Sequence, residues 1–214
     1  MSNWSFWDWI GNSIYFLLAL DALWGAYSAA MVWLRVGQLQ FRNEAQQDAF
    51  MDELKKQIDG RDFPGAVELC SNDRRALPQL ILLGLNNLSL GLEKMGDLLA
   101  ERFQRDVMSD LEGHVGWINN VIKTAPMLGL LGTVMGMMGA FAKLNSGGDV
   151  KPEQLAGDIS VALITTAIGL SIAIPATIFV NNVGNKIKRV DDLVGSGLSR
   201  FFDYVSEVMG TENE

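Results

Sequence analysis

The sequence predicts an all-α integral membrane protein with three transmembrane helices and long helical extensions on the cytoplasmic side. Two long stretches contain no charged residue: 19 residues separate Lys123 from Lys143, and 27 separate Asp158 from Lys186. Hydrophobic residues make up 49% of the 214 residues, and the mean hydropathy of +0.16 is high for a soluble protein. These observations exclude an ordinary soluble domain and a disordered chain.

The first predicted span covers residues 13–34 and follows a periplasmic N-terminus, residues 1–12. It reads SIYFLLALDALWGAYSAAMVWL, and its one acid is Asp21. Three tryptophans fit an aromatic belt at the outer face of the membrane: Trp4, Trp7 and Trp9. No basic residue precedes Arg35, so we expect no cleaved signal peptide.

Residues 35–117 are predicted to form a cytoplasmic helical region. The stretch from Asn43 to Ile58 is polar and amphipathic and ends at Gly60. The stretch from Phe63 to Leu69 is a short helix candidate, with a proline near its start, where proline is favoured.

A long helix is predicted from Pro78 to about Ala142, and its second half, residues 118–142, is the second span. The chain has no proline between Pro78 and Pro126. Apolar residues recur there mostly at helical spacing: Leu80, Leu83, Leu88, Leu92, Met95 and Leu99.

The third span is predicted at residues 159–183, after a periplasmic loop at residues 143–158. The C-terminal segment, residues 184–214, is predicted as a cytoplasmic helix and tail. Its amphipathic part runs from Lys186 to Val208 and repeats apolar residues on one face: Val190, Leu193, Val194, Leu198, Phe201 and Val205.

The basic residues predict the orientation of the chain. Of the 17 Lys and Arg residues, 15 fall on one side of the three spans, and only Lys143 and Lys151 lie in the loop between the second and third. The side rich in Lys and Arg is cytoplasmic. The N-terminus is therefore expected outside and the C-terminus inside, with Trp33 and Trp117 in the inner aromatic belt.

Composition argues against several classes of function. A net charge of −8 and a pI near 4.7 argue against nucleic-acid binding. With one cysteine, Cys70, and one histidine, His114, the chain has no intrachain disulfide and no His/Cys cluster for a metal. The run GLLGTVMG lacks the lysine of a phosphate-binding loop. We expect no enzyme activity and no cofactor.

Small and hydroxyl residues form one stripe on each of the last two spans. Beside Thr133 on the second and Thr166 on the third, the small members are Gly129, Gly132, Gly136, Ala140, Ala162, Gly169 and Ala173. Such stripes let membrane helices pack closely, and here they predict contacts among several copies. The alternative is an ion path lined by the two hydroxyls. A threonine that bonds its own helix backbone would leave the stripe as packing alone.

The second span reads TAPMLGLLGTVMGMMGAF from Thr124, and the third reads ALITTAIGLSIAIPATIFVNN from Ala162. Together, in this order, they resemble the MotA/TolQ/ExbB family of bacterial inner-membrane proton-channel proteins. The three spans and the cytoplasmic insert between the first two fit as well. Length and insert resemble the TolQ and ExbB members more than the larger flagellar stator members.

The resemblance implies a ring, typically a homopentamer, around two copies of a partner. That partner is similar to TolR or ExbD and has one membrane helix with an essential Asp. Ions, usually protons, cross at this Asp and drive partner movement in the periplasm. Thr133 and Thr166 match threonines that the family uses along the ion path, and Pro126 and Pro175 match helix-shaping prolines.

One position departs from the family pattern. TolQ and ExbB members carry a Glu just before the Ala-Leu pair of the third span, where this chain has Val161. Asp158, nearly one helical turn earlier, is a candidate substitute. Asp21 and Thr165 are further candidates for the ion path. We expect Asp21 to be structural, because the two motif-bearing spans can line a path without the first span.

The sequence therefore predicts a ring subunit of an ion-driven motor in the inner membrane. A non-conducting membrane scaffold and a flagellar or gliding stator subunit are the alternatives. A small transporter is disfavoured because the three spans show no inverted repeat. The process that is powered and the choice between H⁺ and Na⁺ stay open.

Overall fold

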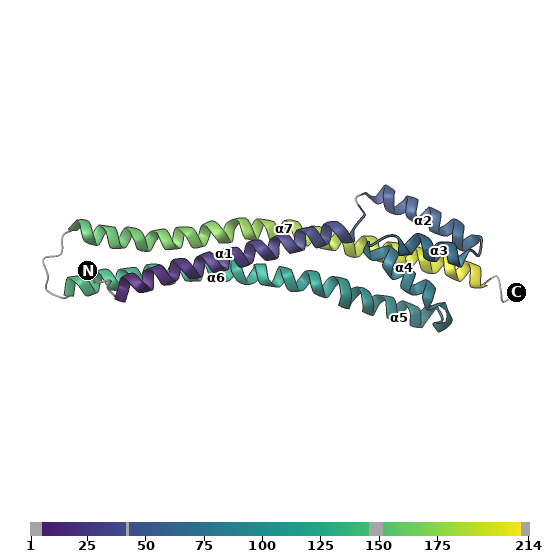
Figure 1. Ribbon diagram of the computed structural model, residues 1–214, viewed down its shortest axis with the longest axis horizontal. Coiled ribbons are helices and arrows are strands. Elements are labelled where there is room, and N and C mark those ends of the chain that lie inside the picture. The colour runs from purple at the N-terminus through teal and green to yellow at the C-terminus, as the bar shows by residue number, and fades with distance from the viewer. Residues whose placement is uncertain (1–5, 42, 146–151, 211–214) are drawn as a thin grey trace. The chain divides into compact units, whose positions relative to one another are not determined.

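A computed structural model describes residues 6–41, 43–145 and 152–210 (Figure 1). Within these ranges the chain forms helices and turns and has no strand. The α-helices are α1 (Phe6–Leu39), α2 (Glu44–Asp59), α3 (Phe63–Ser71), α4 (Ala76–Asn86), α5 (Leu92–Arg102), α6 (Ser109–Asn145) and α7 (Pro152–Gly210). A 3₁₀ turn, η1 (Leu88–Leu90), and a π-helical segment, η2 (Phe103–Met108), complete the order. The all-helical prediction is confirmed.

Three described helices are long and apolar enough to cross a membrane: Ser13–Leu39, Leu92–Asn145 and Leu155–Val208. Each contains one of the predicted spans. The predicted boundaries of the spans, the loop and the cytoplasmic segments stay predictions, because length and composition alone define these three candidates. Trp4 and the side chains of Trp7 and Trp9 lie outside the described residues.

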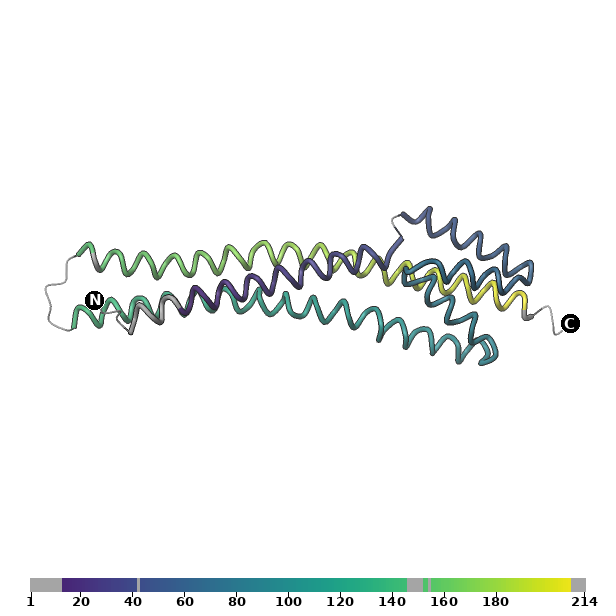
Figure 2. The backbone as a smooth tube through the Cα atoms, in the orientation of Figure 1, coloured from purple at the N-terminus to yellow at the C-terminus, as the bar shows by residue number. Residues whose placement is uncertain are grey.

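The predicted helix from Pro78 to Ala142 is wrong at its start. The chain leaves α4 at Asn86, makes the 3₁₀ turn η1, and enters α5 only at Leu92, so the backbone trace reverses there (Figure 2). Gly91 has φ 81°, a conformation that suits glycine and that other residues rarely adopt. The apolar spacing continues across the break because α4 and α5 each bury an apolar face.

From Leu92 to Asn145 the chain stays helical, with η2 inserted between α5 and α6. The other two short helices match their predictions closely. At the start of α3, the Asp62 carboxylate accepts a hydrogen bond of 3.0 Å from the Gly65 amide, which caps the helix. Pro64 occupies the first turn of this helix.

The chain divides into two compact units, and each unit contains part of α1, part of α6 and part of α7. Unit 1 comprises Met1–Ala30 and His114–Asn182. Unit 2 comprises Met31–Gly113 and Val183–Glu214. Each unit is therefore built from stretches that lie far apart in the sequence.

Unit 2 has the water-excluding core of a soluble helical domain. The largest side chains that are fully buried in it include Leu54, Ile58, Ile81, Leu99 and Phe201. The Phe201 ring packs against Gly84, where a Cβ atom would lie 2.8 Å from the ring. Of the residues predicted on the apolar face of the C-terminal helix, four are buried and two are partly exposed.

Polar contacts in unit 2 join α2 to the last part of α7. The Gln47 amide donates to the Leu193 carbonyl at 2.7 Å. The Arg200 guanidinium pairs with the Asp48 carboxylate at 2.7 Å, and Arg189 pairs with Glu44 at 3.2 Å. These pairs are partly or largely exposed, so they fix the register of the two helices more than they stabilise the fold.

Candidate functional site

The small-residue stripes of α6 and α7 face each other within one chain. A Cβ atom added to Gly129 would lie 2.8 Å from the Thr166 Cα atom, and one on Gly136 would lie 2.6 Å from the Ala162 Cβ atom. At Gly169 an added Cβ atom would collide with the backbone carbonyl of Ala125. The contacts advance along α6 as they go back along α7, so the two helices are antiparallel.

This geometry differs from the prediction that the stripes hold several copies together. Ala140, Ala162 and Ala173 are buried in the single chain, and so are Gly129 and Gly132. The physical reason is that consecutive antiparallel helices are the nearest partners for each other's small faces. The small faces of α6 and α7 are therefore already occupied within the single chain.

Thr133 and Thr166 meet at the middle of this helix pair. Their Oγ1 atoms are 2.5 Å apart, and Thr166 Oγ1 also lies 2.9 Å from the Gly129 carbonyl oxygen. Thr133 Oγ1 also lies 3.2 Å from the Gly129 carbonyl oxygen and 3.3 Å from the Ala162 carbonyl oxygen. Each hydroxyl has one proton, so either threonine can donate to the other while the second donates to a backbone carbonyl. The structure thus brings together the two hydroxyls predicted along an ion path, and their role in such a path stays a prediction.

Thr165 joins the same cluster from the buried side. Its hydroxyl lies 2.6 Å from the Ala162 carbonyl and 3.1 Å from the Gly129 carbonyl. Thr165 is 2% exposed, whereas Thr133 and Thr166 are partly exposed. Thr165 is therefore bonded internally, and the pair formed by the other two threonines presents the accessible polar surface.

The two prolines lie inside helices that continue through them. Pro126 is within α6 and Pro175 is within α7. Gly169 approaches the Cα atom of Pro126, so this proline belongs to the close contact of α6 with α7. Whether the prolines shape the path stays a prediction.

Asp158 does not stand free near the third span. Its carboxylate forms an ion pair with the Lys143 ammonium at 2.7 Å, between the end of α6 and the start of α7. Val161, at the position of the family Glu, is exposed, and its carbonyl accepts a hydrogen bond of 3.3 Å from the Tyr15 hydroxyl. The role of Asp158 as a substitute acid stays a prediction, and it would require the ion pair to open.

Asp21 has a partner that the sequence did not suggest. Its carboxylate accepts a hydrogen bond from the Thr124 hydroxyl on α6, with oxygen distances of 2.8 and 3.0 Å. No spacing rule connects residues 103 positions apart, so only the pairing of α1 with α6 reveals this contact. Among the described residues the hydrogen-bond partner of Asp21 is Thr124, and neither Thr133 nor Thr166 bonds it, so the acid and the threonine pair are separate polar sites.

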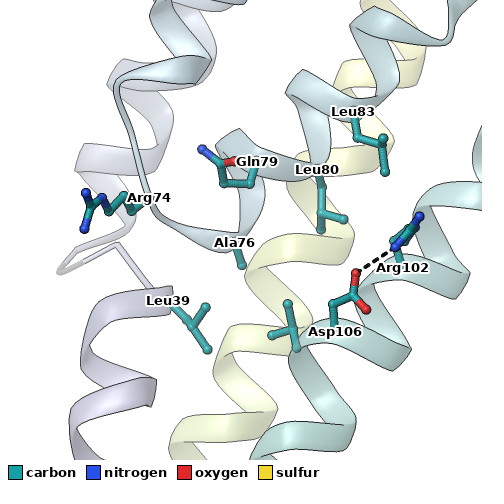
Figure 3. Close-up of a pocket in the computed structure, with 9 residues that line it drawn as sticks. Leu39, Arg74, Ala76, Gln79, Leu80, Leu83, Arg102 and Asp106 are labelled. Atoms are coloured by element: carbon teal, nitrogen blue, oxygen red, sulfur yellow. Dashed lines mark hydrogen bonds and ion pairs between the residues drawn. The ribbon is translucent and has the colours of Figure 1, made fainter.

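Unit 2 holds a cavity of about 390 Å³ that sequence reasoning also missed (Figure 3). Its lining includes Leu39, Leu80 and Leu83, with Arg102 and Asp106 joined by an ion pair of 3.3 Å. Asp106 lies on the π-helical segment η2. Hydrogen bonding from Arg105, supported by Arg102, lowers the pKa of the Asp106 carboxyl.

The described residues contain no group of three or more His, Cys, Asp or Glu side chains placed to hold a metal ion. The Cys70 thiol is buried in α3, and burial raises its pKa to about 12, with a smaller contribution from the Asp73 carboxylate. This cysteine is a packed core residue.

The outer surface of unit 1 is apolar. Large side chains that are exposed on the three apolar helices include Phe16, Leu130, Leu163 and Ile174. In water such a surface would be unstable, and it fits lipid or neighbouring protein. Fold and site together define a helical protein with three membrane-compatible helices and a hydroxyl pair at a close helix contact.

Comparison with known proteins identifies the family. The model of the MotA/TolQ/ExbB proton channel family matches residues 76–194, which is more than half of the chain. This chain belongs to that family, as the resemblance of its second and third spans indicated. The family and the three apolar helices support an inner-membrane, multi-pass protein.

Individual relatives match over shorter stretches. The Tol-Pal system protein TolQ of Haemophilus influenzae is 34% identical over 94 residues, which cover 44% of this chain and 41% of TolQ. The biopolymer transport protein ExbB of Xanthomonas campestris pv. campestris is 41% identical over 88 residues, 40% of this chain and 35% of that protein. The ExbB of Aquifex aeolicus is 28% identical over 114 residues, 51% of this chain and 77% of that protein. The chain thus spans about two fifths of the first two relatives.

Proposed function

We propose that this chain is the ring subunit of an ion-driven motor in the bacterial inner membrane. Protons or Na⁺ move through the ring and shift a partner that is similar to TolR or ExbD, with one membrane helix and a membrane Asp. The movement does work at the cell envelope. The proposal rests on family membership and on the TolQ and ExbB relatives. It includes no enzyme chemistry and no cofactor.

The observation that carries the proposal is the contact between Thr133 and Thr166. The Oγ1 atoms of the pair lie 2.5 Å apart and are partly accessible, on helices whose other exposed side chains are mostly apolar. A hydroxyl both donates and accepts, so the pair can bond a protonated or an ionised carboxyl group without a charge of its own. Such a site suits a partner Asp that gains and loses a proton.

The acid of the path comes from the partner in this proposal. The family Glu position is Val161, Asp158 is paired with Lys143, and Asp21 is bonded to Thr124. The ring then supplies hydroxyls and the partner supplies the titrating group. A polar, uncharged path is compatible with H⁺ and with Na⁺.

We further propose a homopentamer with the N-terminus in the periplasm and the C-terminus in the cytoplasm. The distribution of basic residues supports the orientation. Because the small stripes are occupied within the chain, the exposed apolar faces of the helices form the contacts between copies. A heterologous contact of this kind closes into a ring at a fixed rotation.

The experiment is to co-express the chain with a single-span partner similar to TolR or ExbD from the same organism and to purify the complex in mild detergent. Native mass spectrometry should show five copies of the chain with two of the partner. Liposomes that contain the complex should take up protons, followed with an internal pH dye, or Na⁺, followed with a Na⁺ dye. The chain without partner is the control. Only monomers and dimers, or equal flux with and without partner, would contradict the proposal.

A non-conducting scaffold is the second candidate, and one observation favours it. The threonine hydroxyls bond backbone carbonyls of Gly129 and Ala162, which is what packing alone requires. A scaffold would form the same assembly and pass no ions. The flux measurement separates the two candidates.

A further inference from the structure

A groove of about 790 Å³ runs between α1 and α6 in unit 1. We call it the α1–α6 groove. Its walls are apolar side chains from both helices: Leu17 and Leu20 on α1, and Met127, Leu128 and Leu131 on α6. It lies within the segments that are long and apolar enough to cross a membrane. A lipid chain therefore finds walls of matching chemistry there.

One end of the groove is polar. Asp21 and Thr124 line it, and the Thr124 hydroxyl bonds the carboxylate at 2.8 Å. That hydroxyl also lies 3.1 Å from the Asn120 carbonyl, so its single proton is shared. No other donor to Asp21 occurs among the described residues. A carboxylate has about four acceptor sites, and leaving it so poorly bonded beside apolar walls is costly.

Aromatic side chains mark this end of the groove as the membrane interface, and the residue of α1 at the level of Trp117 is Trp24 rather than the predicted Trp33. Trp24 lines the groove and contacts the Trp117 ring edge-on, with centroids 5.6 Å apart. Tyr27 lies beside Trp24, with ring centroids 6.1 Å apart. Tryptophan and tyrosine gather where lipid headgroups meet hydrocarbon. Lys123, the residue before Thr124, is exposed at the same level.

We propose that the α1–α6 groove binds a phospholipid with a primary-amine headgroup, phosphatidylethanolamine, from the leaflet at the Trp117 end. The lipid ammonium donates to the Asp21 carboxylate and supplies the donors that the protein lacks. The lipid phosphate pairs with Lys123. An acyl chain lies along the apolar walls.

Charge complementarity favours this occupant over a second copy of the chain. Residues 124–142 and 159–185 contain no Lys or Arg, so the one cation that the second and third spans of a neighbour offer near this depth is its own Lys123. That side chain could pair with Asp21 but would leave Lys123 of the first copy without an anion, whereas a phosphoethanolamine headgroup carries an ammonium for Asp21 and a phosphate for Lys123. Phosphatidylglycerol carries no ammonium. Phosphatidylcholine has the positive charge but no N–H donor, so its comparison with phosphatidylethanolamine measures the contribution of the hydrogen bond to Asp21.

The test is native mass spectrometry of the full-length protein after exchange into detergent with one of three lipids. The probes are palmitoyl-oleoyl phosphatidylethanolamine, phosphatidylcholine and phosphatidylglycerol. We expect about tenfold tighter retention of phosphatidylethanolamine than of phosphatidylcholine, as a charge-assisted hydrogen bond gives. The Asp21→Asn variant should lose this preference. Asp158→Asn, whose carboxylate pairs with Lys143, is the matched control and should keep it.

Equal retention of the amine and choline lipids, or preference for phosphatidylglycerol, would overturn the proposal. So would an unchanged preference in Asp21→Asn. A second copy in the groove is tested separately with Leu20→Cys in a Cys70→Ala background. Protection of that cysteine from a lipid-soluble maleimide in assembled protein without added phosphatidylethanolamine would assign the groove to a neighbour. If Asp21→Asn fails to assemble, the comparison of lipid retention on the unmodified protein still tests whether the groove prefers phosphatidylethanolamine.

Discussion

The two units of this chain are both helical, yet they differ in the residues that form their main helix contacts. In unit 1 glycine, alanine and threonine form the contact of α6 with α7, and although a few large side chains such as Leu18 are buried, many others such as Leu163, 58% exposed, face outward. In unit 2 the order is the usual one: Phe201 and Leu54 are 0% exposed, and charged residues lie outside. This difference indicates which interaction stabilises each unit.

Unit 2 is stabilised by removal of apolar surface from water. Unit 1 cannot rely on that force, because its exposed apolar side chains gain nothing from leaving lipid of similar polarity. Its helices are held by close backbone approach and by hydroxyl hydrogen bonds. A substitution should therefore be judged by different criteria in the two units.

The largest effect is expected from Gly169→Leu in unit 1. A Cβ atom at this position would collide with the Ala125 carbonyl, and backbone cannot move aside as a side chain can. Overpacking a core commonly costs about 1–3 kcal/mol, and the cost here should exceed that range, because the whole contact of α6 with α7 must open. We expect loss of assembled protein, measured by size-exclusion chromatography in mild detergent.

Gly116→Leu is the matched control, because a Cβ atom there meets nothing within 4 Å. Assembly at the unmodified level in Gly169→Leu would show that the close approach of α6 and α7 is not what holds unit 1.

The second-largest effect, a loss of stability, is expected from Phe201→Ala in unit 2. Removing a fully buried phenylalanine leaves a cavity next to Gly84 and costs about 3–5 kcal/mol. Thermal unfolding of the full-length protein, followed by circular dichroism, should shift to lower temperature. The neighbouring Phe202→Ala, at a partly exposed position, should shift it much less, and equal shifts would refute a water-excluding core.

An intermediate effect is expected at alkaline pH through Cys70. Below pH 9 the thiol keeps its proton in both the folded and the unfolded chain. Between about pH 9 and pH 12 the unfolded chain loses that proton while the folded chain keeps it, because burial raises the folded pKa to about 12. The free energy of unfolding should therefore fall as pH rises through this window.

Thermal midpoints measured at several pH values test this expectation. Cys70→Ala should flatten the alkaline fall, and an identical slope in the variant would place its cause elsewhere. Below pH 9 a thiol reagent should label the folded protein slowly, because both thiolate and access are lacking.

The smallest effect is expected from Asp21→Asn on motor output. The amide keeps the size of the side chain and still accepts from Thr124, so unit 1 should assemble normally. Activity in a strain that depends on this chain should stay at the unmodified level, because the threonine pair lies elsewhere. A dead variant that still forms rings would place α1 on the ion route.

The sequence predicted the helices that charge and periodicity define. The uncharged stretches placed two apolar helices, and Pro64 near its start signalled α3. The cap at Asp62 emerged only from the structure. The sequence also singled out Thr133 and Thr166 on the two small faces, but their contact with each other appears only in the structure. Family resemblance, more than spacing, gave this pair its proposed role.

The misses have physical reasons. The break at Gly91 was overlooked because the apolar rhythm continues on both sides, although a glycine after two asparagines was a usable signal. The contact of Asp21 with Thr124 depends on tertiary pairing of α1 and α6, which no local pattern encodes. No local pattern shows, either, whether the small-residue stripes of α6 and α7 face each other within one chain or between chains.

In the proposed motor, Thr133 and Thr166 take part in ion conduction as well as in packing. The direct measurement compares the Thr133→Val, Thr166→Val double variant with unmodified protein in liposomes that contain the partner. A membrane hydrogen bond contributes about 0.6 kcal/mol on average, so the account predicts nearly unchanged assembly and thermal midpoint. It predicts that ion uptake falls sharply. Uptake at the unmodified rate, in a double variant that assembles normally, would contradict the account and leave the threonine pair as packing alone.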